Sequence, residues 1–155
     1  MKPYHWNKAS GSTLTVAVKY NTSITTYQST FDTAVSDWNS RQSKIKYNLS
    51  SVNVGSLNWV GTESIADQSL YGDTDVYNSN GIITSFQAKI NIGNSEVVNK
   101  SNTRRSAAVH ELGHSFGLDH TYPPVLSVMN SSRDRETIYT PQTDDINGIN
   151  ASYPF

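Results

Sequence analysis

The sequence contains no cysteine, which excludes disulfides, thiolate nucleophiles and cysteine-based metal sites. No stretch reaches the roughly 18 consecutive apolar residues that a membrane-spanning helix needs. Charge is scarce as well: charged residues make up 16% of the chain, and 12 Lys and Arg against 13 Asp and Glu leave a formal charge of -1. Because this balance offers no basic surface, we expect neither nucleic acid nor a membrane as a partner.

Uncharged polar residues take the place of charge. The chain has 22 Ser, 15 Thr and 15 Asn, about a third of its 155 residues, and 35% of it is hydrophobic. That apolar share is enough for one core, so we expect a single domain over residues 1–155. Residues 1–10 lack the apolar stretch of a signal peptide. The composition therefore fits a cytosolic protein or the mature part of a secreted one.

Apolar residues alternate in some parts of the chain and recur at helical spacing in others. Strand, helix and strand follow one another, which indicates a crossover and a mixed sheet, and thus an α+β fold. We expect Gly117 to end the second helix, and the helix starts to be capped by a Thr25–Gln28 box, by Asn102 or Thr103, and by Thr140. The strands are predicted at residues 13–20, 45–49, 57–60, 70–77 and 82–92, and the helices at residues 25–41, 101–116 and 141–153.

Three of the four histidines fall within residues 110–120, which read HELGHSFGLDH. On a helix, His110 and His114 project from one face, one turn apart, and can bind the same cation. His120 lies outside that face, but a turn at Gly117 can bring it to the same point, since glycine takes positive φ without steric cost. Three neutral imidazoles with one open position are typical of catalytic zinc.

Glu111 directly follows the first of these histidines and projects about 100° around the helix, beside the metal. Zinc lowers the pKa of a bound water to about 7, and a neighbouring carboxylate can take the proton as that water attacks a carbonyl. The pattern therefore predicts hydrolysis of an amide or peptide bond, with Glu111 as base and acid. A bare His-Glu-x-x-His also arises by chance, but Gly117 and His120 make an accidental match improbable.

Residues 110–120 fit the long zinc signature of the metzincin clan of metallopeptidases, and HELGHSFGLDHT resembles the matrixin family most closely. Residues 141–155, PQTDDINGINASYPF, are similar to the last helix of matrixins. The resemblance implies a twisted mixed five-stranded sheet with two long helices, over residues 1–117. It implies a smaller part, residues 118–155, that holds a Met-turn and the final helix. It also implies a secreted, monomeric, zinc-dependent endopeptidase of extracellular proteins, whose signal and any prosegment are absent from this chain.

The resemblance assigns further residues. Met129 matches the methionine of the Met-turn, an apolar floor under the three histidines, and Ser131 stands where some metzincins carry a tyrosine ligand. Asp144 and Asp145 either complement the dipole of the last helix or brace the Met-turn. The segment Asn130 to Glu136 resembles the specificity loop that walls the pocket for the residue after the cut, but lacks the family's Pro-x-Tyr.

Substrate in this family lies extended along an edge strand, which would be Leu70 to Tyr77 here. Vertebrate-type matrixins carry a second zinc on a histidine-rich loop. His5 is the only histidine of this sequence outside residues 110–120, so we expect no second zinc site. Calcium on Asp67, Asp73 and Asp75 is possible chemistry, although carboxylates solvated in turns explain these residues more simply. The pattern therefore predicts one zinc per chain and leaves calcium open.

Two other functions stay open at this level. The chain could be a zinc hydrolase of a non-protein amide or a cell-wall peptide, or an inert zinc-binding homologue. The intact Glu111 argues against the inert module, since zinc retention does not require that carboxylate. Arg104 and Arg105 are read as the exposed flank of the second helix.

Overall fold

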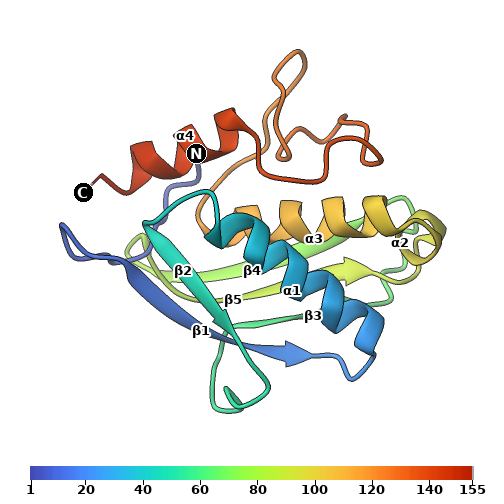
Figure 1. The fold of residues 1–155 in the computed structure, drawn as a ribbon, viewed down its shortest axis with the longest axis horizontal. Coiled ribbons are helices and arrows are strands. Elements are labelled where there is room, and N and C mark those ends of the chain that lie inside the picture. Colours follow the sequence, from blue (N-terminus) through green and yellow to red (C-terminus); the bar gives the residue numbers. More distant parts are fainter. Residues whose placement is uncertain (155) are drawn as a thin grey trace.

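Five strands form one mixed sheet in the computed structural model, which describes residues 1–154 (Figure 1). The strand order is β2-β1-β3-β5-β4, and every neighbouring pair is parallel except β4 with β5. The predicted mixed α+β sheet is confirmed, and β4 lies at one edge of it. The strands are β1 (Leu14–Asn21), β2 (Ile45–Leu49), β3 (Trp59–Glu63), β4 (Gly72–Ser79) and β5 (Ile82–Asn91).

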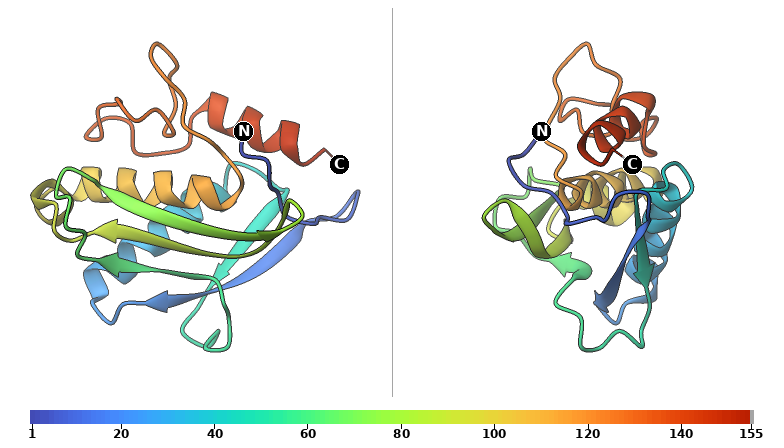
Figure 2. Two further views of the ribbon diagram at one scale, coloured as in Figure 1. Left: turned by 180° about the vertical axis from the view of Figure 1, so that it is seen from behind. Right: turned by 90° about the vertical axis from the view of Figure 1, so that its left-hand side faces the viewer.

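Two long helices, α1 (Thr25–Asn39) and α3 (Ser101–Ser115), pack side by side on one face of the sheet. The short helix α2 (Ser95–Asn99) precedes α3 directly. Beyond α3, on the side away from the sheet, lies the segment that ends in α4 (Thr143–Ser152), so that α3 is covered on both sides (Figure 2). Within residues 1–154, none of the helices has the length and apolar character needed to cross a bilayer.

The core lies between the sheet and the two long helices. Phe31, Ala34 and Trp38 follow one another at helical spacing on α1 and are fully buried. The Trp38 Nε1–H donates to the Val109 carbonyl oxygen on α3 at 3.0 Å, which fixes one helix against the other. Burial of this apolar stripe positions α3, the element that carries the histidine cluster.

The helix caps differ from the sequence predictions. Ile24 precedes α1 and no side chain caps it; Gln28 Nε2 instead donates to the Thr22 carbonyl oxygen at 2.8 Å. Lys100 precedes α3, again without a side-chain cap. The last helix begins at Thr143, with Gln142 and Asp145 forming its capping box in place of Thr140. Local hydrogen bonds other than the predicted ones therefore accompany the starts of α1 and α4.

The helix α2 was not predicted. Its cap is Asn94, whose Oδ1 accepts hydrogen bonds from the backbone N–H groups of Glu96 and Val97 at 2.9 and 3.2 Å. This helix ends where α3 begins. A single residue, Lys100, follows α2 and precedes α3, so it occupies the capping position of both helices. The strands β3 and β4 also begin and end two to three residues later than predicted. Leu57 and Leu70, the first residues of the two predicted strands, are exposed rather than buried in the sheet.

The sequence suggested that Arg105 lies on an exposed flank of the helix, but the structure pairs it with a buried residue. Its Nε and Nη2 atoms donate to the two carboxylate oxygens of Asp37 on α1, at 2.9 and 2.8 Å. Asp37 is buried, so this bidentate ion pair links the two long helices through a charge that has little access to water.

We predict that Arg105→Met lowers the free energy of unfolding by about 2 kcal/mol, because it leaves the buried Asp37 carboxylate with a poorer partner. Urea denaturation measures the change. Lys100→Met is the control, since the Lys100–Glu96 pair is exposed and should contribute much less to stability. Equal losses in the two variants would contradict the role assigned to Arg105.

Candidate metal centre

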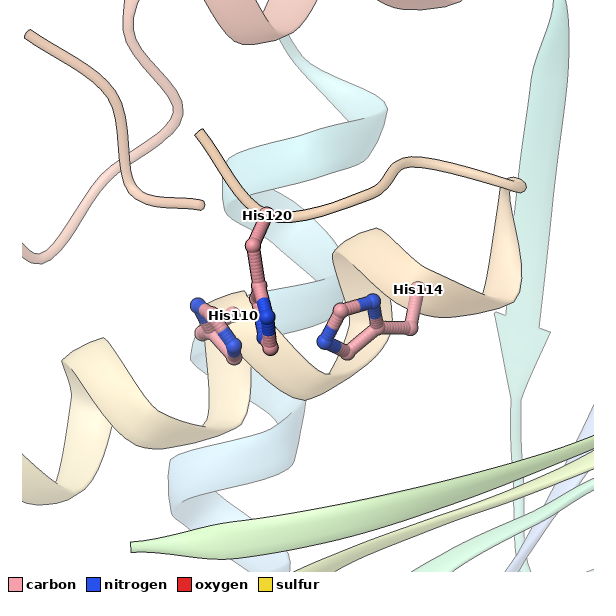
Figure 3. Close-up of side chains that lie close together, drawn as sticks. All are labelled: His110, His114 and His120. Atoms are coloured by element: carbon pink, nitrogen blue, oxygen red, sulfur yellow. The ribbon is translucent and has the colours of Figure 1, made fainter. Parts of the chain in front are cut away.

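The three clustered histidines meet in space. His110 and His114 project from successive turns of α3, and His120 reaches them from the segment that follows (Figure 3). One ring nitrogen of each lies within 4.8 Å of the others, and the ring centroids are 4.8 to 5.2 Å apart. No other cluster of three potential ligands occurs among residues 1–154.

A reversal of the chain brings His120 back over the helix. Gly117 has φ +93°, a conformation that side chains rarely adopt, and a Cβ there would lie 2.6 Å from the Tyr4 carbonyl oxygen. The backbone N–H groups of Gly117 and Leu118 donate to the carbonyl oxygens of His114 and Gly113, which closes the helix end. The predicted turn at Gly117 is confirmed.

Backbone carbonyls orient two of the imidazoles. The His110 Nδ1–H donates to the Val128 carbonyl oxygen at 2.8 Å, and the His114 Nδ1–H donates to the Leu118 carbonyl oxygen at 2.9 Å. With Nδ1 protonated, the lone pair of each ring is on Nε2. A hydrogen bond from the other ring nitrogen to a carbonyl is the usual support of a metal-binding histidine.

The environment keeps the imidazoles neutral. Burial lowers the pKa of His110 well below its usual value and lowers the pKa of His114 to about 4, with burial again the main cause. The pKa of His120, which is more exposed, is lowered in the same direction by desolvation. Because a metal binds the unprotonated ring, the three residues present the donor form that zinc requires.

Glu111 lies beside the cluster without joining it. Its carboxylate is buried, and the Oε1 atom is 4.0 Å from His110 Nε2. The Thr74 hydroxyl on β4 lies 2.7 Å from Glu111 Oε2 and 3.0 Å from the Glu111 carbonyl oxygen. Burial raises the pKa of Glu111 to about 7. Sequence reasoning missed Thr74, which is 37 residues away and recognisable only from the pairing of β4 with the sheet.

A pocket of about 320 Å³ opens at this point of the molecule. Its wall combines the segment leading into β4 with the centre of α3 and with residues 131–135, and includes His110, Glu111 and His120. A larger hollow of about 650 Å³ lies elsewhere, beside Lys19 and Gln28, and contains none of the clustered histidines. Another pocket of about 340 Å³ touches His120 from the side of Met129 and α4, but only the 320 Å³ pocket also contains His110 and Glu111.

The fold agrees with comparisons to known proteins. A family model described as matrixin, of the M10 peptidases, matches residues 5–154. The chain belongs to the matrixin family. A search of curated proteins gives no match.

Three solved structures show the same fold as this matrixin. One is high choriolytic enzyme 1, a hatching enzyme zinc-protease from the medaka fish Oryzias latipes, with a TM-score of 0.59 and 14% identity over 96% of this chain and 94% of that one. Archaemetzincin from Methanopyrus kandleri gives 0.59 and 14%, over 92% and 97%. Myroilysin gives 0.60 and 12%, over 97% and 96%. At such low identities these likenesses establish the fold alone.

Met129 packs against α3 between the two helical histidines of this matrixin. It is buried, and a Cβ at Gly113 would lie only 2.3 Å from the Met129 sulfur. Glycine at position 113 is therefore needed for the methionine to approach the helix. The contact places Met129 against the helix that carries His110 and His114, and its role as an apolar floor under the three histidines stays a prediction.

Asp145 braces the turn that contains Met129. Its carboxylate accepts hydrogen bonds from the Ser127 hydroxyl at 2.5 Å and from the backbone N–H groups of Val128 and Gln142 at 2.9 and 2.8 Å. Val128 in turn supplies the carbonyl that orients His110. Asp144, by contrast, is exposed in the first turn of α4, so it can only complement the helix dipole. The two readings of this pair therefore apply to one residue each.

The carboxylates considered for calcium do not come together within the described part of the chain. Asp67 accepts hydrogen bonds from the backbone and hydroxyl of Ser69 at 3.0 and 2.6 Å. Asp73 and Asp75 lie on β4 beside Lys89, whose Nζ is 3.8 and 2.7 Å from them. These groups serve a turn and an ion-pair network, and the calcium hypothesis gains no support.

We predict that Asp145→Asn lowers the unfolding free energy by about 2–3 kcal/mol, because an amide nitrogen would face groups that donate hydrogen bonds and need an acceptor. The adjacent Asp144→Asn serves as a matched control and should cost less than about 0.5 kcal/mol. Chemical denaturation of both variants measures the difference. A similar cost at the two positions would disprove the bracing role of Asp145.

Acid should destabilise the metal-free protein through His114. Its folded pKa of about 4 lies below the ordinary histidine value of 6.5, so its contribution to stability is complete above about pH 6.5 and is lost as the pH falls towards 4. Relative to His114→Gln, the parent should lose about 3 kcal/mol of unfolding free energy between pH 7 and pH 4. Urea midpoints at both pH values test this. Parallel losses would mean that His114 titrates normally in the folded state.

Proposed function

We propose that this matrixin is a zinc-dependent endopeptidase that hydrolyses peptide bonds of extracellular proteins. His110, His114 and His120 are its metal ligands, and Glu111 is its general base and acid. The observation that carries the proposal is the convergence of three neutral imidazoles beside a buried carboxylate, next to an edge strand. We propose zinc alone as the cofactor.

The donor set fits zinc. Three imidazole nitrogens without a thiolate or a fourth protein ligand leave a coordination position free, which is the composition of catalytic rather than structural zinc sites. Zinc bound there would polarise the substrate carbonyl and lower the pKa of the attacking water. The hydrogen bonds from His110 and His114 to backbone carbonyls hold those two rings in the orientation that binding requires.

Glu111 would move the proton. In the metal-free protein burial raises the pKa of Glu111 to about 7, so its surroundings accommodate both the carboxylate and the carboxylic acid, as a group that takes and returns a proton requires. It would accept the proton of the attacking water and later deliver it to the departing amine. Thr74 holds the carboxylate in place through Oε2, which leaves Oε1, the oxygen nearer to His110, for this transfer.

A substrate peptide would bind along β4. This strand pairs with β5 on one side only and therefore presents unpaired backbone groups on the other. Because Thr74 belongs to β4 and contacts Glu111, a peptide added to this edge passes next to the carboxylate. Binding through the backbone suits many sequences, as an endopeptidase of proteins requires. Secretion and a monomeric state complete the proposal, on the basis of the matrixin resemblance.

The test is Glu111→Gln, which keeps the size of the side chain and removes its capacity to accept a proton. We predict that kcat for casein falls by about 10²- to 10⁴-fold while the zinc content stays at one per chain. Treatment with a chelator should abolish cleavage in the parent, and zinc should restore it. Glu63→Gln, at an exposed carboxylate of β3 outside the pocket, should behave like the parent.

Other outcomes would point elsewhere. Zinc bound at one per chain without cleavage of any peptide would identify an inert module. Cleavage confined to non-protein amides or cell-wall peptides would identify a different hydrolase. Proteolysis that survives in Glu111→Gln at the level of the parent would remove Glu111 from the mechanism.

A further inference from the structure

Two arginines line the pocket beside the metal centre, Arg133 and Arg135. Both belong to the segment 130–136 that was read as the specificity loop. They face the helix α3 on one side and the segment around Tyr71 on the other. A cationic wall is unexpected for a site that binds extended peptides mainly through their backbone, and it demands a physical explanation.

Arg133 is held rigidly. Its Nε donates to the Ser106 hydroxyl at 2.9 Å, Nη2 donates to the Ser106 carbonyl oxygen at 3.1 Å, and Nη1 donates to the Asn130 carbonyl oxygen at 3.2 Å. Nη1 also lies 3.3 Å from Nδ1 of His110. The side chain is only 8% exposed. Neutral acceptors therefore fix a buried positive charge against the ligand cluster.

Arg135 is placed differently. Its guanidinium lies 3.7 Å from the centroid of the Tyr71 ring, and Nη2 donates to the Ser131 carbonyl oxygen at 3.1 Å. Its Nε is shielded from solvent without any hydrogen-bond partner among the described residues. A planar cation stacked on an aromatic face keeps its edge free for a further acceptor. Arg135 is thus oriented, but most of its N–H groups have no acceptor.

No carboxylate pairs with either arginine. Within residues 1–154, neither guanidinium has a carboxylate oxygen within 4.0 Å. Glu96 and Glu111 are near enough to attract the Arg135 guanidinium, but neither forms an ion pair with it. Glu96 accepts from the Tyr71 hydroxyl at 2.6 Å and pairs with Lys100 at 3.1 Å, and Glu111 accepts from the Thr74 hydroxyl. Buried charges are normally paired, because desolvation without a partner is costly. The missing partner of these arginines is therefore to be sought in the ligand.

We propose that this pocket selects an acidic side chain, Asp or Glu, at the substrate residue that follows the cleaved bond. Arg135 would donate hydrogen bonds to the substrate carboxylate from the edge of its guanidinium. Arg133, which is held in place nearby, would attract the same carboxylate through its positive charge. The pocket of about 320 Å³ is at the small end for a binding site, and because it also includes the space beside His110, Glu111 and His120, the part next to the arginines has room for no more than one side chain. The inference rests on the proposed peptidase function, which it extends to a substrate class.

The first experiment is cleavage of a peptide library by the zinc-loaded protein, with matched peptides that carry Glu, Gln, Leu or Lys after the cut. We expect kcat/KM for Glu to exceed that for Gln and Leu by about tenfold or more, because a charge-assisted hydrogen bond replaces a neutral contact. Lys should be the poorest residue. The preference for Glu should shrink at high salt.

Variants of Arg135 assign the preference to this side chain. In Arg135→Met the ratio of kcat/KM between the Glu and Leu peptides should fall to near one, and Arg135→Lys should restore part of it. Arg135→Glu should invert the order of the Glu and Lys peptides. Arg41→Met removes an exposed arginine outside the pocket and should keep the parental ratio. A parental ratio in Arg135→Met would overturn the proposal, as would an acidic preference confined to the residue before the cut.

Binding measurements separate the two proposals. Fluorescence anisotropy gives the affinity of the zinc-loaded Glu111→Gln protein for the same peptides without turnover. Tighter binding of the Glu peptide, lost in the double variant with Arg135→Met, supports the acidic subsite even if the parent cleaves nothing. Efficient cleavage with equal kcat/KM for the Glu, Gln and Leu peptides would instead support the peptidase function and refute the proposed selectivity for acidic residues.

Discussion

Three imidazoles can share one cation only if the helix that carries two of them ends and reverses before the third. The structure meets this constraint at Gly117, whose positive φ and lack of a Cβ let the chain turn against the backbone of Tyr4. The turn places Leu118 so that its carbonyl orients His114, and His120, three residues after Gly117, faces the cluster. One backbone conformation thus both assembles the cluster and supports one of its members.

A second line of support runs through the C-terminal segment. Asp145 accepts a hydrogen bond from the Val128 N–H, and the Val128 carbonyl orients His110. Met129 packs closely against the helix at Gly113. Helix α4 therefore contributes to the centre although none of its residues reaches the histidines. Buried groups in such a chain of hydrogen bonds are fully satisfied, which gives the site a defined geometry before any ligand arrives.

The histidine cluster could be predicted from sequence because its geometry is local: a spacing of four on a helix and a glycine shortly after it. The same holds for the β1 face, where Val16 and Val18 are buried as the alternation indicates. The contacts of Thr74 with Glu111 and of Asp37 with Arg105 join residues 37 and 68 positions apart, so no local pattern encodes them. The capping box expected at Thr25 does not form, because the Gln28 side chain donates a hydrogen bond to the Thr22 carbonyl oxygen instead.

The side-chain placement of the two pocket arginines could not be predicted from the sequence either. Their segment was identified from the family resemblance, yet the sequence did not reveal that Arg133 turns inward onto Ser106 or that Arg135 stacks on Tyr71. Nor did it reveal α2, whose cap at Asn94 is a readable signal followed by only five helical residues. Charge without a partner became visible only once the tertiary structure fixed which groups are neighbours.

The central claim concerns the ligands, and X-ray absorption spectroscopy of the zinc-loaded protein tests it most directly. The account predicts one zinc per chain with three imidazole nitrogens at about 2.0–2.1 Å and one further light atom, and a loss of one imidazole in His120→Ala. A zinc with two imidazoles in the parent, or a spectrum unchanged in His120→Ala, would contradict it.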